Sequence, residues 1–122
     1  MLDKKHIKYF KKILPVDFVL SEEGDCWAYG YDNSKMHVMP ECVLFADSKA
    51  QIKGIVQYCF ENTIPITTRG RGTGNTGGSV PIENSVVLSL EKMNKIIDID
   101  ISNRLAVVQP GVINKTLQDE LQ

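Results

Sequence analysis

The sequence lacks a long apolar run, and no stretch of it approaches the length that crosses a bilayer. Residues 1–6 also lack the apolar core of a secretory signal. An excess of one charge is missing as well, because the net charge of the 122 residues is only −1, which offers nucleic acid no overall attraction. We therefore expect a cytoplasmic protein with no integral membrane segment and no nucleic-acid partner.

Cysteine and histidine are scarce. The three cysteines, Cys26, Cys42 and Cys59, fit no CxxC or zinc-site spacing, and their number is odd. Neither His6 nor His37 has a partner four positions further on. We expect reduced thiols and no metal site, with Cys59 in the core because it lies in an apolar helical stripe.

The first predicted element is a short helix over residues 3–14, which Pro15 ends. One side of it is apolar, and the other carries Lys4, Lys5, Lys8, Lys11 and Lys12. Such a helix suits contact with anionic lipid. The other interpretation, which we favour for so short a segment, is a docked helix with solvated lysines. Residues 16–39 are typical of a loop, with Trp27 and Tyr31 expected in the core or at an interface.

A strand–helix–strand unit is predicted next. The apolar run 42–46 is typical of a buried strand, and 64–68 of a second strand. Between them, Ser48 and Gln51 match a capping box that begins a helix over 48–62. This order predicts two parallel strands joined by a helical crossover.

A glycine-rich loop follows the second strand directly. It consists of Arg69, Gly70, Arg71, Gly72, Thr73, Gly74, Asn75, Thr76, Gly77 and Gly78. Its five glycines permit a close approach of backbone to ligand, and successive amides in such a loop form an anion-binding concavity. No acidic residue occurs between Glu61 and Glu83. These features predict a pyrophosphate cradle, and the alternative is a flexible surface turn.

Two common nucleotide-binding motifs do not fit this loop. Residues 72–77 match GxGxxG, but a Rossmann fold needs a helix at the last glycine, and residues 79–85 are not typical of one. A P-loop needs a lysine after its last glycine, where Gly78 and Ser79 stand. A Rossmann or triphosphate-hydrolysing enzyme is therefore the weakest hypothesis.

Beyond the loop, a strand over 86–90 and an antiparallel hairpin of 96–100 and 105–109 are predicted. Asn114 is expected to cap a last helix, and the sequence stops inside that helix.

Several segments in this order resemble the FAD-binding domain of the vanillyl-alcohol oxidase/p-cresol methylhydroxylase (VAO/PCMH) superfamily. Within it, the resemblance is to the glycolate oxidase D subunit and FAD-linked D-lactate dehydrogenases. Tyr29 and Asp32 also fall where those proteins carry a Tyr-x-x-Asp pair. The segments that carry the resemblance are 40–43, 48–62, 64–78, 86–90, 93–94 and 108–112.

The resemblance implies an incomplete α+β fold of the VAO/PCMH type, in which a small parallel βαβ subdomain precedes a second, mixed α/β subdomain. Residues 1–39 would be a lead-in, 40–100 the first FAD-binding subdomain and 101–122 the start of the second. FAD would place its pyrophosphate on the glycine loop. The implied cofactor-binding residues are Arg69, Gly70, Arg71, Gly72, Thr73, Gly74, Asn75, Thr76, Gly77, Gly78, Pro110 and Gly111.

The resemblance also has limits. Residues 69–78 contain no histidine, so the flavin is expected to be non-covalent at this loop. Arg69 and Arg71 either offset phosphate charge or are solvated. Family members continue for hundreds of residues, and their substrate-binding residues lie mainly in the part absent here, so no catalytic residue is implied.

We therefore expect a truncated chain, the FAD-binding portion of a flavin-dependent oxidoreductase that acts on 2-hydroxy acids of the glycolate or D-lactate type. By itself it is expected to be inactive. The alternative is a non-catalytic nucleotide-binding or assembly module that pairs with itself or with a separately encoded remainder.

Overall fold

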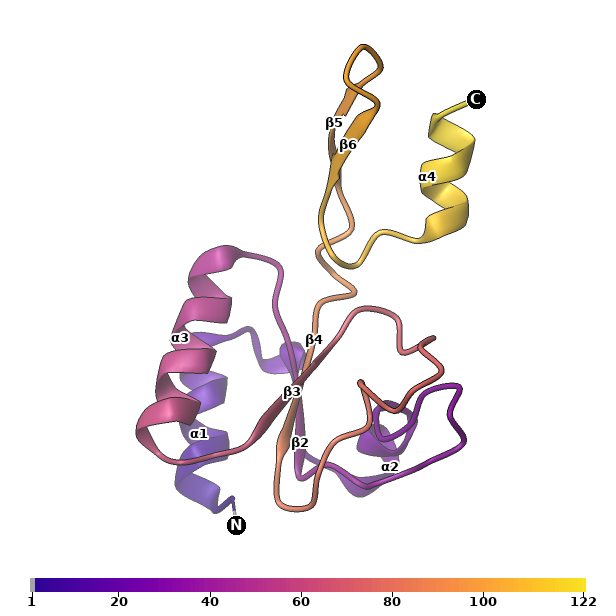
Figure 1. The fold of residues 1–122 in the computed structure, drawn as a ribbon. Coiled ribbons are helices and arrows are strands. Elements are labelled where there is room, and N and C mark those ends of the chain that lie inside the picture. Colours follow the sequence, from indigo (N-terminus) through magenta and orange to yellow (C-terminus); the bar gives the residue numbers. More distant parts are fainter. Residues whose placement is uncertain (1) are drawn as a thin grey trace.

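The sheet at the centre of the molecule has four strands in the order β1-β2-β4-β3 (Figure 1). The computed structural model describes residues 2–122. The strands are β1 (Val19–Leu20), β2 (Cys42–Phe45), β3 (Ile66–Arg69) and β4 (Val86–Ser89). β2, β4 and β3 run parallel, whereas β1 pairs with β2 in the antiparallel sense.

The predicted strand–helix–strand unit is present, but its two strands are not neighbours. β4 lies between β2 and β3, with Val86 opposite both Cys42 and Ile66. All four residues of β2 and of β4 are buried, as in central parallel strands covered on both faces. β3 is less buried and carries Thr67 and Thr68, so it takes the edge.

Two helices cover one face of the sheet (Figure 1): α1 (Lys4–Ile13) and α3 (Lys49–Glu61). Phe10 from α1 and Ile55 and Cys59 from α3 pack on Leu44 and Leu88 of the sheet. The core position predicted for Cys59 is confirmed. Burial raises the pKa of its thiol to about 11, so this thiol is poorly reactive at neutral pH.

The start of α3 confirms half of the predicted capping box. Ser48 Oγ accepts a hydrogen bond from the backbone N–H of Gln51 at 3.3 Å. The reciprocal bond differs, because Gln51 Oε1 accepts from the N–H of Asp47 at 2.8 Å and not from that of Ser48. The glutamine side chain thus reaches one residue further back than a capping box requires.

The segment that was expected to be only a loop contains the edge strand β1 and the single-turn helix α2 (Glu23–Cys26). α2 lies on the face of the sheet opposite α1 and α3 (Figure 1). Cys26 packs with Val43, Phe45 and Val87 in a second, smaller cluster. Trp27 and Tyr31 lie outside the core, since 56% of Trp27 and 44% of Tyr31 are exposed. Of the two positions expected for them, core or interface, the core position is therefore wrong.

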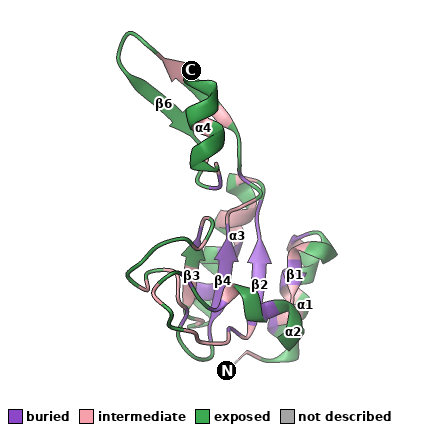
Figure 2. Ribbon diagram, turned by 90° about the vertical axis from the view of Figure 1, so that its right-hand side faces the viewer, coloured by how far each residue is buried: buried purple, intermediate pink, exposed green. Residues whose placement is uncertain are grey.

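Residues 96–120 stand away from the sheet (Figures 1 and 2). The predicted hairpin is confirmed as β5 (Ile96–Asp100) and β6 (Leu105–Val108), which pair antiparallel with an irregularity near Ile96. The boundary predicted after residue 100, between the first and the second FAD-binding subdomain, falls inside this hairpin. That boundary stays a prediction. The last helix, α4 (Asn114–Glu120), begins at Asn114, so the expected cap is wrong: the preceding residue is apolar and makes no side-chain cap bond.

Candidate functional site

The glycine loop (residues 69–78) leaves the carboxyl end of β3 and folds against residues 31–36 (Figure 1). Asn33 donates hydrogen bonds to two carbonyls of the glycine loop. The backbone N–H of Asn33 donates to the carbonyl of Gly74 at 2.9 Å, and its side-chain Nδ2 donates to the carbonyl of Thr73 at 3.0 Å. The loop is therefore buttressed from one side by a segment that is remote in the sequence.

This buttress sets the direction of two loop amides. The peptide bonds are all trans, and a trans peptide places its C=O and the following N–H on opposite sides. Because Asn33 binds the carbonyls of Thr73 and Gly74, the N–H groups of Gly74 and Asn75 face away from it. Within residues 2–122, neither of these amides donates a hydrogen bond to the protein. Two adjacent free N–H groups of this kind form an anion-binding concavity.

Asp32 fixes the other end of the loop. Its buried carboxylate accepts from the N–H of Gly77 at 3.1 Å through Oδ2 and from the N–H of Ser34 at 2.7 Å through Oδ1. Hydrogen bonds to Ser34, and then to Gly77 and Ser79, hold the pKa of Asp32 below its ordinary value. The sequence showed no acid near the loop, and the fold corrects that view, although this charge is engaged by the loop's own amides.

The glycines of the loop divide into two groups. Three are required by the fold: a Cβ on Gly70 would lie 2.9 Å from the carbonyl oxygen of Pro110, and Gly72 and Gly77 have φ values of +69° and +82°. Gly74 and Gly78 are different. Within the described residues, a Cβ on Gly78 would meet nothing within 4 Å, and one on Gly74 only the Asp32 carboxylate at 3.9 Å. The absence of side chains there has no internal explanation and fits a closely approaching ligand.

Arg69, the first residue of the loop, contacts residues 29–31. Only 9% of this residue is exposed, and its Nη1 donates to the carbonyl of Tyr31 at 3.1 Å. The guanidinium carbon lies 5.3 Å from the centre of the Tyr29 ring, at cation–π distance. The side chain thus ties β3 to residues 29–31 and is largely withdrawn from the surface of the loop.

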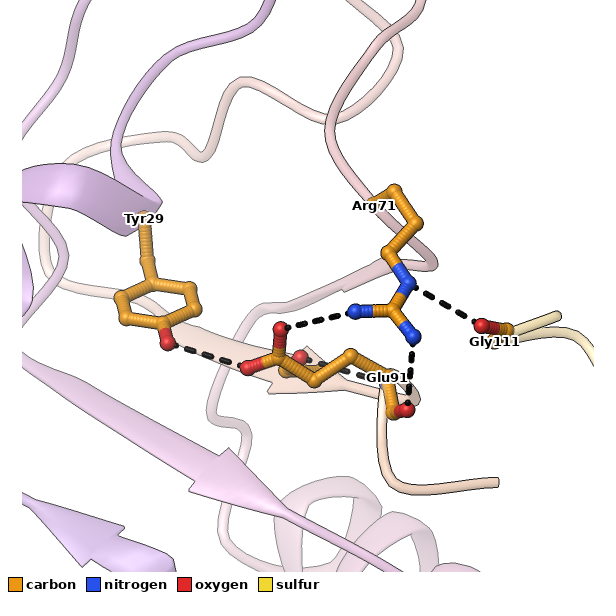
Figure 3. A network of polar contacts seen from close by, with 5 residues as sticks. Tyr29, Arg71, Glu91 and Gly111 are labelled. Carbon is orange, nitrogen blue, oxygen red and sulfur yellow. Dashed lines mark hydrogen bonds and ion pairs between the residues drawn. The ribbon is translucent and has the colours of Figure 1, made fainter. Parts of the chain in front are cut away.

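Arg71 joins the loop to the chain segments that lead into and out of the hairpin (Figure 3). Its Nε donates to the carbonyl of Gly111 at 3.0 Å, and its Nη2 lies 3.4 Å from the carbonyl of Glu91. Nη1 forms an ion pair with the Glu91 carboxylate at 3.6 Å. The same carboxylate accepts from the Tyr29 hydroxyl at 3.0 Å. Burial and this bond to Glu91 raise the pKa of Tyr29 to about 12.

The structure brings together the two parts of the expected site. Pro110 lies against Gly70, and Gly111 is bound by Arg71. Gly111 is buried, and a Cβ on it would collide with backbone atoms of residues 90–93, so its role is to let the two connecting segments meet. The remaining predicted side chains lie exposed on the loop, free to reach a ligand: Thr73, Asn75 and Thr76.

Sequence reasoning missed Asn33. The only signal was the polar run 32–35, which was interpreted as a loop. In an Asx turn, an Asp side chain accepts a hydrogen bond from the backbone N–H two residues further on, as Asp32 does from Ser34. The pattern could have indicated the turn, but not the loop to which it binds.

Comparison with known proteins identifies the family. A family model described as an FAD binding domain matches residues 40–122. The chain belongs to this family of FAD binding domains. Glycolate oxidase subunit GlcD of Bacillus subtilis is 41% identical over 86 residues, which are 70% of this chain and 18% of that protein. D-lactate dehydrogenase of Anaerostipes hadrus is 35% identical over 116 residues, or 93% of this chain and 24% of that protein.

Solved structures place this FAD binding domain in the VAO/PCMH-type fold. A p-cresol methylhydroxylase with substrate bound superposes with a TM-score of 0.84 and 34% identity, over 97% of this chain and 24% of that one. An alkyldihydroxyacetonephosphate synthase has the same fold, with a TM-score of 0.85 at 17% identity over 99% of this chain and 25% of that one. The predicted α+β fold, incomplete relative to these proteins, is confirmed.

This FAD binding domain spans about a fifth to a quarter of the length of the relatives named above. Within residues 2–122, the glycine loop has two amides without a hydrogen-bond partner and two glycines at which a Cβ would meet no atom closer than 3.9 Å, and both features are compatible with a bound phosphate group. Among residues 2–122, no helix has the length and apolar character to cross a membrane.

Proposed function

We propose that this chain holds FAD, non-covalently, by its pyrophosphate on the glycine loop. The single observation that carries the proposal is the pair of outward N–H groups of Gly74 and Asn75, held in place by Asn33. Gly74 and Gly78 let the phosphates approach the backbone closely. The loop contains no histidine for covalent attachment.

The roles of the chain's own residues follow from this geometry. The amides of Gly74 and Asn75 donate to the phosphate oxygens, and the exposed hydroxyls of Thr73 and Thr76 add further donors. Asp32 keeps the amide of Gly77 engaged and so holds the curvature of the loop. When bound, FAD supplies the electron acceptor of the reaction. We assign no catalytic residue to this chain.

We further propose that the domain serves an oxidoreductase that acts on 2-hydroxy acids. Its support is the pair of curated relatives named as a glycolate oxidase subunit and a D-lactate dehydrogenase, both above 30% identity. The chain spans only a small part of each relative, so we propose that it is inactive alone.

The test compares ligands that differ in phosphate content. FAD and ADP, which contain a diphosphate, should bind the purified chain in calorimetry, whereas riboflavin, which contains none, should not. Absence of FAD binding, or equal binding of riboflavin, would contradict the proposed site. Glycolate or D-lactate added to the FAD-loaded chain should leave the flavin absorbance unchanged, and bleaching would contradict the proposed inactivity while supporting the substrate class.

The second candidate function is assembly with another copy or a separate polypeptide. It is favoured by the apolar surface of the hairpin, where more than half of each of three large side chains is exposed: Ile97, Ile101 and Leu105. A two-stranded hairpin is only marginally stable in isolation, and its free edges can accept another strand. Light scattering after size exclusion tests self-assembly, and a monomer at every concentration would contradict that form of it.

A further inference from the structure

Two hollows lie next to each other at the end of the sheet where the parallel strands β2 and β4 begin. Ser21, which follows β1, and Glu41, which precedes β2, line both of them. The hairpin stands at the other end of the sheet (Figure 1), and the glycine loop leaves the carboxyl end of β3. We call the two hollows together the charged groove.

One hollow of the charged groove is basic. Helix α1 contributes three lysines to it at positions i, i+4 and i+7, which form a single stripe along the helix: Lys4, Lys8 and Lys11. All three side chains are exposed. They outnumber the two acids that line the same hollow, Asp3 and Glu41.

The other hollow is acidic. The described residues that line it include no lysine or arginine, but they include three glutamates: Glu23, Glu41 and Glu83. The thiol of Cys26 lines this hollow as well. Burial, and then the negative charges of Asp25 and other nearby acids, raise the pKa of this thiol to about 11. The negative charge of this region thus acts on the buried thiol beneath the surface.

Neither set of charges is neutralised within the domain. Among residues 2–122, none of these three lysines and none of these three glutamates forms an ion pair. A partner that satisfies both hollows must present acids opposite the lysines and bases opposite the glutamates. The distance between its two charged regions must also match the distance between the two hollows.

We propose that the charged groove binds the charged groove of a second copy of this chain, in a dimer with two-fold symmetry. In a two-fold contact, the lysines of each copy face the glutamates of the other copy, and the distance between the hollows matches because both copies have the same surface. The net charge of the chain is only −1, so the overall repulsion between two copies is small. Opposite charges across the contact fix the relative orientation of the two copies.

The dimer leaves the other candidate surfaces of the chain free. The charged groove lies at the beginning of β2 and β4, whereas the hairpin stands beyond their other end (Figure 1). The proposal goes beyond FAD binding and does not depend on it. It also uses a surface different from the apolar hairpin, so each form of self-assembly can fail without the other.

The experiment is analytical ultracentrifugation of the whole chain over a range of protein and salt concentrations. Dimers should form at low salt and dissociate as the ionic strength rises, because exposed charge pairs are screened. The variant Lys8→Glu/Lys11→Glu should raise the dissociation constant about 100-fold, since each reversed charge occurs twice in a two-fold contact. Glu23→Lys/Glu83→Lys should have a similar effect.

Mixing these two groove variants gives the sharpest test. In the mixed dimer, every reversed hollow faces an oppositely reversed hollow of the other variant, and the two unchanged hollows also face each other. An equimolar mixture should therefore recover dimers that neither variant forms alone. The matched control Lys53→Glu/Lys95→Glu makes the same change of net charge at exposed lysines outside the groove. It should dimerise like the wild type, and its mixture with Glu23→Lys/Glu83→Lys should recover fewer dimers.

Two further controls complete the design. Circular dichroism checks that each variant is folded, and Ile101→Ser, in the exposed hairpin turn, should leave the dimer intact. The proposal is overturned if the wild type is monomeric at every concentration in low salt, or if the groove variants dimerise no more weakly than the control. It is also overturned if the two folded groove variants remain monomeric when mixed, or if only Ile101→Ser disrupts the dimer, which would assign self-assembly to the hairpin.

Discussion

The backbone N–H of Asn33 donates to the carbonyl of Gly74 at 2.9 Å, and its side chain binds the preceding carbonyl, that of Thr73. One residue thereby fixes two consecutive peptide planes of the glycine loop. The side of the loop that faces solvent is then the side with free N–H groups. In the proposed site, the direction of the free amides thus depends on a residue whose own hydrogen bonds go to the loop carbonyls.

The substitution Asn33→Ala should weaken FAD binding about five- to tenfold. It removes the side-chain bond to Thr73 and lets that peptide plane rotate, while the backbone bond to Gly74 remains. The free energy of unfolding should fall by about 1 kcal/mol, the contribution of one hydrogen bond. Calorimetry and urea unfolding measure the two effects. Asn94→Ala, at an exposed position outside the site, is the control, and equal loss in both variants would exclude the proposed role.

The substitutions Gly74→Ala and Gly78→Ala should separate cofactor binding from folding. Neither glycine has a positive φ, and within the described residues neither added Cβ meets an atom closer than 3.9 Å. The unfolding free energy should stay constant or rise by about 0.4–1 kcal/mol. FAD affinity should fall about tenfold or more, because the methyl group displaces the phosphates from the amides.

Gly24→Ala is the matched control for these two substitutions, since a Cβ there also meets nothing within 4 Å in the described structure. Gly24 lies in α2, outside the glycine loop. It should leave FAD affinity unchanged. If Gly74→Ala and Gly78→Ala also leave it unchanged, the ligand does not approach the backbone at these positions.

The stability of the chain should depend on the ionisation of Asp32. The pKa of this carboxyl is lower in the folded state, because the N–H groups of Ser34 and Gly77 bind the charged form. Its contribution is therefore present above the ordinary Asp pKa of about 3.9 and is lost as the pH falls through the lower, folded value. Urea unfolding of Asp32→Asn should show a weaker decline of stability over this acidic range. Asp17→Asn, on an exposed residue, should keep the full decline.

The substitution Arg71→Gln should loosen the connection between the sheet and the hairpin. It removes the hydrogen bond to the Gly111 carbonyl and the ion pair with Glu91. Amide hydrogen exchange in residues 90–93 and 109–112 should become about tenfold faster, since charged hydrogen bonds contribute about 1.5–3 kcal/mol each. Arg104→Gln, in the exposed hairpin turn, should leave these segments unchanged. Equal exchange in wild type and Arg71→Gln would show that other contacts hold the connection.

Most of the local elements could be predicted from patterns of neighbouring residues. Periodic apolar positions indicated α1, α3 and the strands, because burial of a stripe or a run is a property of neighbouring residues. Five glycines without an acid among them indicated the phosphate loop, and the absence of a predicted helix after it argued against the Rossmann fold. The order of these segments was sufficient to suggest the family that the comparisons later showed.

The way in which these elements meet could not be predicted from such patterns. Strand order is set by which strand can be covered on both faces, so β4 lies between β2 and β3 although it follows both of them in the sequence. The direction of the loop amides is set by Asn33, and the guanidinium groups of Arg69 and Arg71 are turned inward by carbonyls that lie far away in the sequence. Hydrogen bonds between distant residues depend on the packed geometry of the whole chain, which no local pattern of residues encodes.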